Sequence, residues 1–313
     1  MAKKSIVTHF RDEKGMRLTL GDLIFKVVVY LILITLTIAT LYPVLHVVFA
    51  SVSDPVELRN HYGLLAGPRG FTTEGYKLVF NDDRIMGGYK NTLIYVSLGT
   101  AVNMIFTILA AFTLSRKDMM LKKFFNILMT ITMFFGGGLI PWFLITKELG
   151  MYNNLAAMII PTAISTWNII LLRTGFQQVP RELEEAAEVD GASQAFILFK
   201  VYIPLSKAII AVILLYYLVG NWNSWFNPMI LLKDREKFPL QLYLREILIV
   251  NEASGATQAG ANSHAVSTAI GTSAYRELLK YATIVVSTAP IMCIYPFLQK
   301  YFIKGVFVGS IKG

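Results

Sequence analysis

The stretch Pro180–Pro204 reads PRELEEAAEVDGASQAFILFKVYIP and interrupts a chain that is otherwise strongly apolar. Pro180 suits the first position of a helix, where its missing N–H is not needed, and the glutamates that follow favour the positive end of the helix dipole. Gly191 predicts the end of this helix, because glycine adopts the left-handed conformation without strain. Ser193 can then cap a second, shorter helix. The stretch therefore predicts two helices joined by a tight turn.

The composition places this stretch in a membrane protein. The chain has 313 residues, of which 55% are hydrophobic and 16% charged, and its mean hydropathy is +0.54. Ordinary soluble domains are less apolar, and a helix needs about 20 apolar residues to cross a bilayer. We expect an all-α, polytopic membrane protein with six transmembrane helices, at residues 24–50, 92–114, 124–145, 155–172, 208–232 and 281–303.

These spans divide the chain into one transmembrane unit with short extensions. The first span is too long for the core of a signal peptide, so we expect it to be retained. The expected segments are a cytoplasmic leader (1–23), the first transmembrane helix (24–50), an outer loop (51–91), a helical core (92–303) that contains the charged loop 180–204 and an outer loop 233–280, and a cytoplasmic tail (304–313).

The distribution of charge sets the expected topology. The chain carries 29 Lys and Arg against 20 Asp and Glu, a net charge of +9. The basic residues concentrate in the leader, in residues 116–123, around the charged loop and at the C-terminus, and the positive-inside rule places such segments in the cytoplasm. Both termini are therefore expected to be cytoplasmic. Because topology accounts for the charge, we expect membrane lipid as a partner and no nucleic acid.

Two local patterns add detail to the spans. The three glycines Gly136–Gly138 lie inside the third predicted span, where glycine allows either close helix packing or local unwinding. We favour close packing. After the fifth span, Leu240–Ile249 predicts a short helix on the outer surface.

Spacing within the charged loop is more specific than its charge, since a charge run alone usually marks a solvated hairpin. Glu185–Ala187 is followed after three residues by Gly191 and, nine residues later, by Val201–Pro204. This pattern resembles the EAA signature of the membrane subunits of binding-protein-dependent ABC importers. Val201 and Ile203 are conservative replacements at its two aliphatic positions.

The resemblance implies a role for this loop. In the family it is the coupling helix, which docks in a cleft of the cytoplasmic ATPase and transmits the closure of that ATPase to the membrane helices. Small side chains permit close approach to a partner, and the glutamates offer acceptors for its Arg or Lys. The coupling residues implied are Glu185, Ala186, Ala187, Asp190, Gly191 and Pro204.

From about Ile24 onward the chain looks like a permease subunit of carbohydrate-uptake ABC importers, similar to the MalG subunit of the maltose system and to the LplC and YtcP branch. The resemblance implies a type I importer permease fold in a bacterial inner (cytoplasmic) membrane. It also implies a second permease subunit, a cytoplasmic ABC ATPase dimer that binds ATP and Mg, and an extracytoplasmic solute-binding protein that delivers the sugar. The expected function is import of carbohydrates, oligosaccharides in particular, by alternating access.

A second polar stretch, Gly220–Pro228, lies in the fifth predicted span. Amides at this depth need partners, because hydrocarbon offers none. They could line a water-filled path and bond sugar hydroxyls while a tryptophan stacks on a sugar ring, or they could form an interfacial belt with bonds between helices. We favour the path for Asn221, Trp222 and Asn223, because the family often has a similar run there, and leave both interpretations open for Trp225 and Asn227.

Absent motifs narrow the function further. The sequence has no GxxxxGK[ST], so ATP hydrolysis is expected on a partner chain. It has no GxSxG or HExxH, and its four histidines are scattered. We therefore expect a transport subunit without a catalytic site, metal or cofactor of its own. The alternative is an ion-coupled secondary carrier for a small polar solute, which generally needs intramembrane ionisable groups, and the predicted spans contain no Asp or Glu.

Overall fold

The computed structural model describes residues 20–257, 276–294 and 296, and every regular element in this part of the chain is a helix. The expected all-α fold is confirmed. An isolated β-bridge between Ser53 and Phe71 closes the loop after the first helix. The tail 304–313 and most of the leader 1–23 lie outside the described residues.

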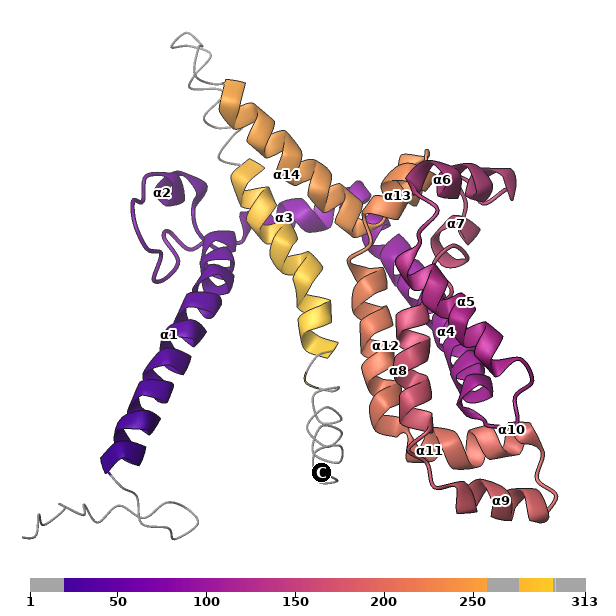
Figure 1. The fold of residues 1–313 in the computed structure, drawn as a ribbon. Coiled ribbons are helices and arrows are strands. Elements are labelled where there is room, and N and C mark those ends of the chain that lie inside the picture. The colour runs from indigo at the N-terminus through magenta and orange to yellow at the C-terminus, as the bar shows by residue number, and fades with distance from the viewer. Residues whose placement is uncertain (1–19, 258–275, 295, 297–313) are drawn as a thin grey trace, which may run out of the picture.

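The first helix, α1 (Leu20–Ser51), stands apart from the other helices (Figure 1). Its buried residues are Ala50 and Ser51, at its C-terminal end. Most apolar side chains along the rest of the helix are exposed in the described part of the chain. Such a surface needs lipid or another protein around it.

Short helices gather at the end of the molecule where α1 finishes (Figure 1). Two of them, α2 (Pro55–Arg59) and α3 (Glu74–Asn81), lie in the expected outer loop 51–91. The long helix α4 (Asp83–Ser115) begins inside this loop rather than at Thr92. Asp82 caps that start, because its carboxylate accepts a hydrogen bond from the next turn at 2.9 Å. The outer loop is therefore partly helical and shorter than expected.

The third predicted span is not a single helix. It divides into α5 (Lys122–Phe134) and α6 (Leu139–Glu148), which are bent by 114° relative to one another. The break falls on the three glycines: Gly138 has a φ of +83°, and a Cβ at Gly136 or Gly137 would meet nothing within 4 Å. The prediction of close packing is wrong here, and the glycines instead let the chain unwind and turn.

The fourth predicted span is also divided, into α7 (Ala156–Ile159) and α8 (Thr166–Phe176). Pro161 lacks the N–H that a continuous helix would use. The hydroxyl of Ser165 then caps α8 by accepting from the N–H of Asn168 at 3.4 Å. The fifth predicted span likewise gives two helices, α12 (Lys207–Trp222) and α13 (Phe226–Leu231).

Three helices of the described residues are long and apolar enough to cross a membrane: α1, α4 and the C-terminal helix Arg276–Ile294. Two bent pairs, α5 with α6 and the run Gln194–Leu205 with α12, raise this number to five if each pair is one span. The fourth predicted span is missing from this set because α7 and α8 are both short. The expected six spans are therefore supported only in part.

The central bundle consists of α4, α8 and α12 (Figure 1). Gly175 of α8 lets α12 approach closely, since a Cβ there would lie 2.7 Å from Cγ2 of Ile209. Thr107 and Tyr217 join α4 to α12 through their hydroxyls at 2.6 Å. The apolar core comprises Ala111, Phe112, Leu172, Phe176, Val179, Ile197, Leu198, Tyr202, Ile213 and Tyr217.

The segment after α13 is bound to the N-terminal part of α4. It contains the short helix η2 (Arg235–Lys237) and then α14 (Leu240–Thr257), which confirms a helix at Leu240–Ile249 and extends it. The hydroxyl of Thr92 accepts from the N–H of Leu240 at 2.8 Å. Tyr95 donates to the carbonyl of Lys237 at 2.8 Å.

Candidate functional site

The charged loop begins with α9 (Arg181–Val189), and Gly191 follows its C-cap residue Asp190, which confirms the predicted stop. Gly191 has a φ of +78°. Its N–H donates to the carbonyl of Glu188 at 3.0 Å, and the N–H of Ala192 donates to that of Ala187 at 2.9 Å. These two bonds form a Schellman motif. Pro180 immediately precedes the helix instead of occupying its first position.

The second helix of the loop is longer than predicted. It runs through α10 (Gln194–Ile197), a π-helical segment η1 (Leu198–Tyr202) and α11 (Ile203–Leu205). The hydroxyl of Ser193 caps it, as predicted, by accepting from the N–H of Phe196 at 3.3 Å. The run then bends by 87° into α12.

The residues implied as coupling sites lie mostly on the outer surface of this loop. Glu185, Ala186 and Asp190 are exposed, and the neighbouring Val189 is 89% exposed. Ala187 is half-buried and packs against the bundle core. Gly191 is exposed at the turn, and Pro204 is exposed near the end of the second helix. The outer face of α9 thus combines small side chains with carboxylates.

The inner side of α9 is bound to Arg116, the residue that follows α4. Arg116 lies 2.8 Å from a carboxylate oxygen of Glu184, 2.9 Å from one of Glu188 and 3.0 Å from one of Asp118. The Arg116 and Glu184 side chains are each 13% exposed. Arg116 also bonds Gln194 of the second helix. Two glutamates expected to be acceptors for a partner protein are therefore bonded within this chain.

Sequence reasoning missed this cluster because its members are far apart in the chain. The available signal was an arginine directly after a long apolar run, followed by a carboxylate two residues later. Hydrogen bonds from Arg116 lower the pKa values of Asp118 and Glu188 below their ordinary range. Bonds to Asp118 and Glu188 raise the pKa of Arg116 despite its partial burial. All three groups are charged at neutral pH.

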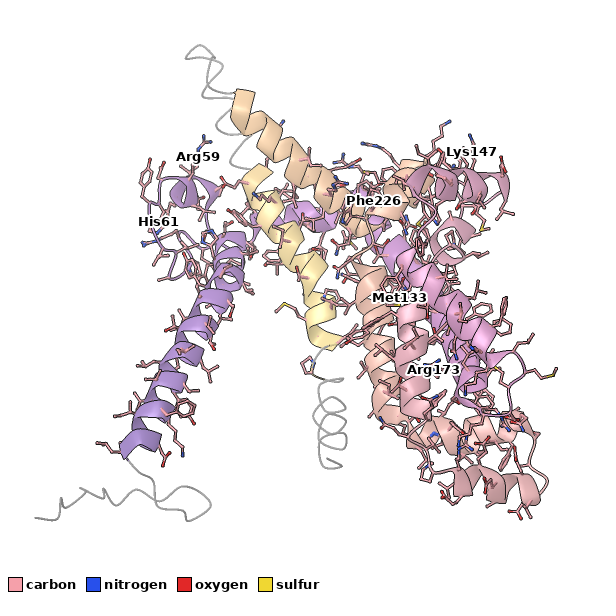
Figure 2. All side chains as sticks on the ribbon, viewed as in Figure 1. Arg59, His61, Met133, Lys147, Arg173 and Phe226 are labelled. Carbon is pink, nitrogen blue, oxygen red and sulfur yellow. The ribbon has the colours of Figure 1, made fainter. Side chains whose placement is uncertain are left out.

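A pocket of 460 Å³ lies towards the other end of the bundle, away from the Arg116 cluster. Phe226 at the start of α13 marks its position in Figure 2. Every lining side chain is uncharged. The lining residues are Thr92, Tyr95, Met158, Thr162, Ser165, Asn168, Tyr217, Gly220, Asn221, Asn223, Ser224, Trp225, Phe226, Asn227, Pro228 and Pro239.

Four of the five residues predicted for a substrate path line this pocket, and Trp222 does not. Trp222 is 3% exposed and donates its indole N–H to the carbonyl of Ser287 at 2.9 Å. Its ring meets that of Tyr89 edge to face. Trp222 therefore joins α12 to α4 and to the C-terminal helix.

Asn221 lines the pocket and also bonds between helices. Its amide nitrogen lies 3.1 Å from the hydroxyl of Thr100 and 3.0 Å from the amide oxygen of Asn103. Gly99 makes room for it, since a Cβ there would lie 3.2 Å from the same nitrogen. The Asn221 amide can therefore both line a substrate path and form bonds between helices.

Trp225 is already stacked against a side chain of this chain. The guanidinium carbon of Arg245 lies 3.6 Å from the centre of the Trp225 ring, which is a cation–π contact. Arg245 also donates to the sulfur of Met229 at 3.1 Å. The Trp225 ring also meets the ring of Phe226 edge to face, so at least one of its faces is already in contact with this chain.

The described residues contain no group of three or more His, Cys, Asp or Glu side chains able to hold a metal ion. The two candidate sites offer different chemistry. One is a charged loop that can bind a protein surface, and the other is a neutral pocket of hydroxyls and amides.

Comparison with known proteins identifies the family. Residues 103–233 match the family described as "Binding-protein-dependent transport system inner membrane component". The polygalacturonan/rhamnogalacturonan transport system permease protein YtcP of Bacillus subtilis (strain 168) is 36% identical over 293 residues, covering 93% of this chain and 99% of YtcP. Protein LplC of the same organism is 36% identical over 274 residues, covering 88% and 90%.

A solved structure agrees with these relatives. A chain in the crystal structure of a bacterial ABC transporter involved in the import of the acidic polysaccharide alginate superposes with a TM-score of 0.81 and 32% identity, covering 92% of this chain and 99% of that one. The expected resemblance to YtcP and LplC is thus confirmed, as is a membrane transport subunit rather than an enzyme. The chain belongs to the inner membrane permeases of binding-protein-dependent transport systems.

Proposed function

We propose that this chain is one of two permease subunits of an ATP-driven importer of oligosaccharides and that it works by alternating access. The exposed face of α9 carries the proposal, because it presents Glu185, Ala186 and Asp190 at the end of the bundle that an ATPase would approach. Closure of the ATPase dimer would displace α9, and the bundle would turn from inward-facing to outward-facing.

The proposed substrate class rests on the names of the relatives and on the pocket. YtcP is named for polygalacturonan and rhamnogalacturonan transport, and AraQ of Halalkalibacterium halodurans, 26% identical, for arabinooligosaccharides. Oligosaccharides present many hydroxyls, which amides and hydroxyls can bind as both donors and acceptors. The pocket offers such groups from Asn223, Asn227 and Ser224, and the Trp225 ring is also part of its lining.

The proposed topology has six spans and cytoplasmic termini. It is supported by the arrangement in Figure 1, where the start of α1, the loop containing α9 and the last described turns of the C-terminal helix lie towards the same end. The fourth span would consist of α7, the connecting residues and α8 together. The basic residues of the inner segments support the same orientation.

An ATPase as the source of energy is favoured over an ion gradient by the buried side chains. The buried polar residues among the described ranges are Ser, Thr and Asn. An ion-coupled carrier generally keeps ionisable groups inside the membrane. The proposed partners are therefore a second permease, an ATPase dimer that binds ATP and Mg, and a solute-binding protein outside the cell.

Purification of the tagged chain from its native membrane in mild detergent tests this proposal. A second permease and an ATPase are expected to co-purify and to be identified by mass. Recovery of the chain alone, under conditions that preserve a known importer complex, would contradict the proposal and favour a self-sufficient carrier.

A further inference from the structure

The attachment of α9 to the bundle is largely polar. No residue of this helix is buried. Ala187 packs against the bundle core, whereas Glu184 and Glu188 form ion pairs with Arg116. The position of α9 relative to α4 therefore depends on the Arg116 cluster.

Both carboxylate oxygens of Glu184 have a partner within the chain. One oxygen forms an ion pair with Arg116 at 2.8 Å, and the other accepts a hydrogen bond from the hydroxyl of Tyr202 at 2.6 Å. Arg116 directly follows α4, and Tyr202 ends the π-helical segment that leads towards α12. A displacement of Glu184 would therefore act on two separate elements, α4 through Arg116 and the π-helical segment through Tyr202.

The route through Arg116 is the more direct of the two. The helix α4 is unbroken over 33 residues, a length of about 50 Å at the usual rise, and near its far end it supplies Thr92 and Tyr95 to the pocket. The route through Tyr202 must pass the bend of 87° at the start of α12. An unbroken helix can carry a displacement along its axis without such a turn.

We propose that Arg116 is a positioning residue for coupling, which transmits the displacement of α9 to α4 through Glu184 and so moves the pocket lining. This inference rests on the proposed function. Arginine suits the role better than lysine, because its planar guanidinium can bond Glu184, Glu188 and Asp118 at once, whereas an ammonium group is a single point of charge.

The test measures sugar uptake and ATP hydrolysis by the assembled importer in proteoliposomes, with loaded binding protein. Arg116→Gln is expected to lower the sugar imported per ATP hydrolysed by about fivefold or more, the usual size of a coupling effect. Arg116→Lys should fall between this variant and the wild type. Lys117→Gln is the matched control: Lys117 is exposed and forms no ion pair within the described ranges, so both rates should stay unchanged.

A double-mutant cycle separates transmission from a general structural role. Glu184→Gln should lower the ratio of uptake to hydrolysis as Arg116→Gln does, and the double variant should be no worse than either single one. A normal ratio in Arg116→Gln, or losses that multiply in the double variant, would overturn the inference.

Assembly is checked by recovery of the partner chains with each tagged variant. If Arg116→Gln does not assemble, the ratio of sugar uptake to ATP hydrolysis in Arg116→Lys and Glu184→Gln tests the inference instead. A wild-type complex that shows neither sugar uptake nor sugar-dependent ATP hydrolysis would contradict the proposed function itself, so the two failures are distinguishable.

Discussion

The amide nitrogen of Asn221 in α12 lies 3.0 Å from the amide oxygen of Asn103 in α4. Asn103 is buried and donates its own amide to the carbonyl of Thr162. One side chain therefore links the residues before α8 to α4, and a second links α4 to α12. Polar residues hold together the helices that form the pocket.

Removal of this link should weaken the bundle. Asn221→Ala leaves the amide oxygen of Asn103 without its donor and is expected to cost about 1 kcal/mol of stability, as is typical for hydrogen bonds between membrane helices. Asn223→Ala is the control, since Asn223 is exposed. Thermal unfolding of the purified complex measures the stability of both variants. Equal melting temperatures for the two would contradict a stabilising role of the bond between Asn221 and Asn103.

Substitutions at Trp222 should lower the stability of the complex more than they lower the rate of transport by the assembled complex. Trp222→Ala removes a buried ring and is expected to cost about 3–5 kcal/mol, which would lower the amount of assembled complex. Trp222→Phe keeps much of the volume but loses the bond to Ser287, and should keep uptake per assembled complex near the wild-type value. Loss of uptake in well-assembled Trp222→Phe would instead support a direct role in the path.

The contrast between Asn221 and Trp222 shows what the sequence could predict. Periodicity placed both in the same helix, and composition showed that polar groups there need partners. Adjacent helical residues point in directions about 100° apart, so one reaches the pocket while its neighbour enters a helix interface. Which one does so depends on the packing of α4 and of the C-terminal helix, which are distant in the chain.

Gly191 should be sensitive to substitution for conformational reasons. A Cβ at Gly191 would meet no atom within 4 Å, but the positive φ strains any β-branched residue placed there, at a cost of about 1–2 kcal/mol. Membrane insertion should stay normal while substrate-stimulated ATP hydrolysis is lost. Gly191→Asn, which tolerates this conformation, should retain most of the activity, and normal coupling in Gly191→Val would contradict the role of the loop.

A substitution at Trp225 tests whether the substrate passes through the pocket. Trp225→Ala should reduce oligosaccharide uptake several-fold without preventing assembly, because an aromatic ring that lines the pocket is lost. Arg245→Gln removes the charge on the occupied face and should change uptake less. Radiolabelled uptake at matched amounts of complex distinguishes these outcomes, and unchanged uptake in Trp225→Ala would assign the ring to structure alone.

The Arg116 cluster should be insensitive to pH near neutrality. Hydrogen bonds from Arg116 lower the pKa values of Asp118 and Glu188, so their contribution is complete above the ordinary carboxyl values of about 4. It is lost as the pH falls through the lowered pKa values. Hydrogen exchange of α9, corrected for intrinsic rates, should therefore show constant protection between about pH 6 and 8. Loss of protection within that range would contradict the ion-pair attachment.

The charged loop was more predictable than the membrane spans. Its turn depends on Gly191 and its second cap on Ser193, and local chemistry determines both. The third and fourth spans were each predicted as one continuous stretch, because an apolar window contains the same residues whether or not the helix continues. The tripeptide Gly136–Gly138 marked one break, but its alternative role in packing could be rejected only once the neighbouring helices were placed.

The uncharged lining of the pocket has a consequence for the choice of cargo. Amides and hydroxyls attract neutral and acidic sugars without the strong preference that a charged side chain would impose. If oligosaccharides pass through this pocket, this chain selects among them mainly by size, and the binding protein that delivers them sets the chemical specificity. A change of the solute-binding protein alone could then give the importer a new substrate, while the permease stays the same.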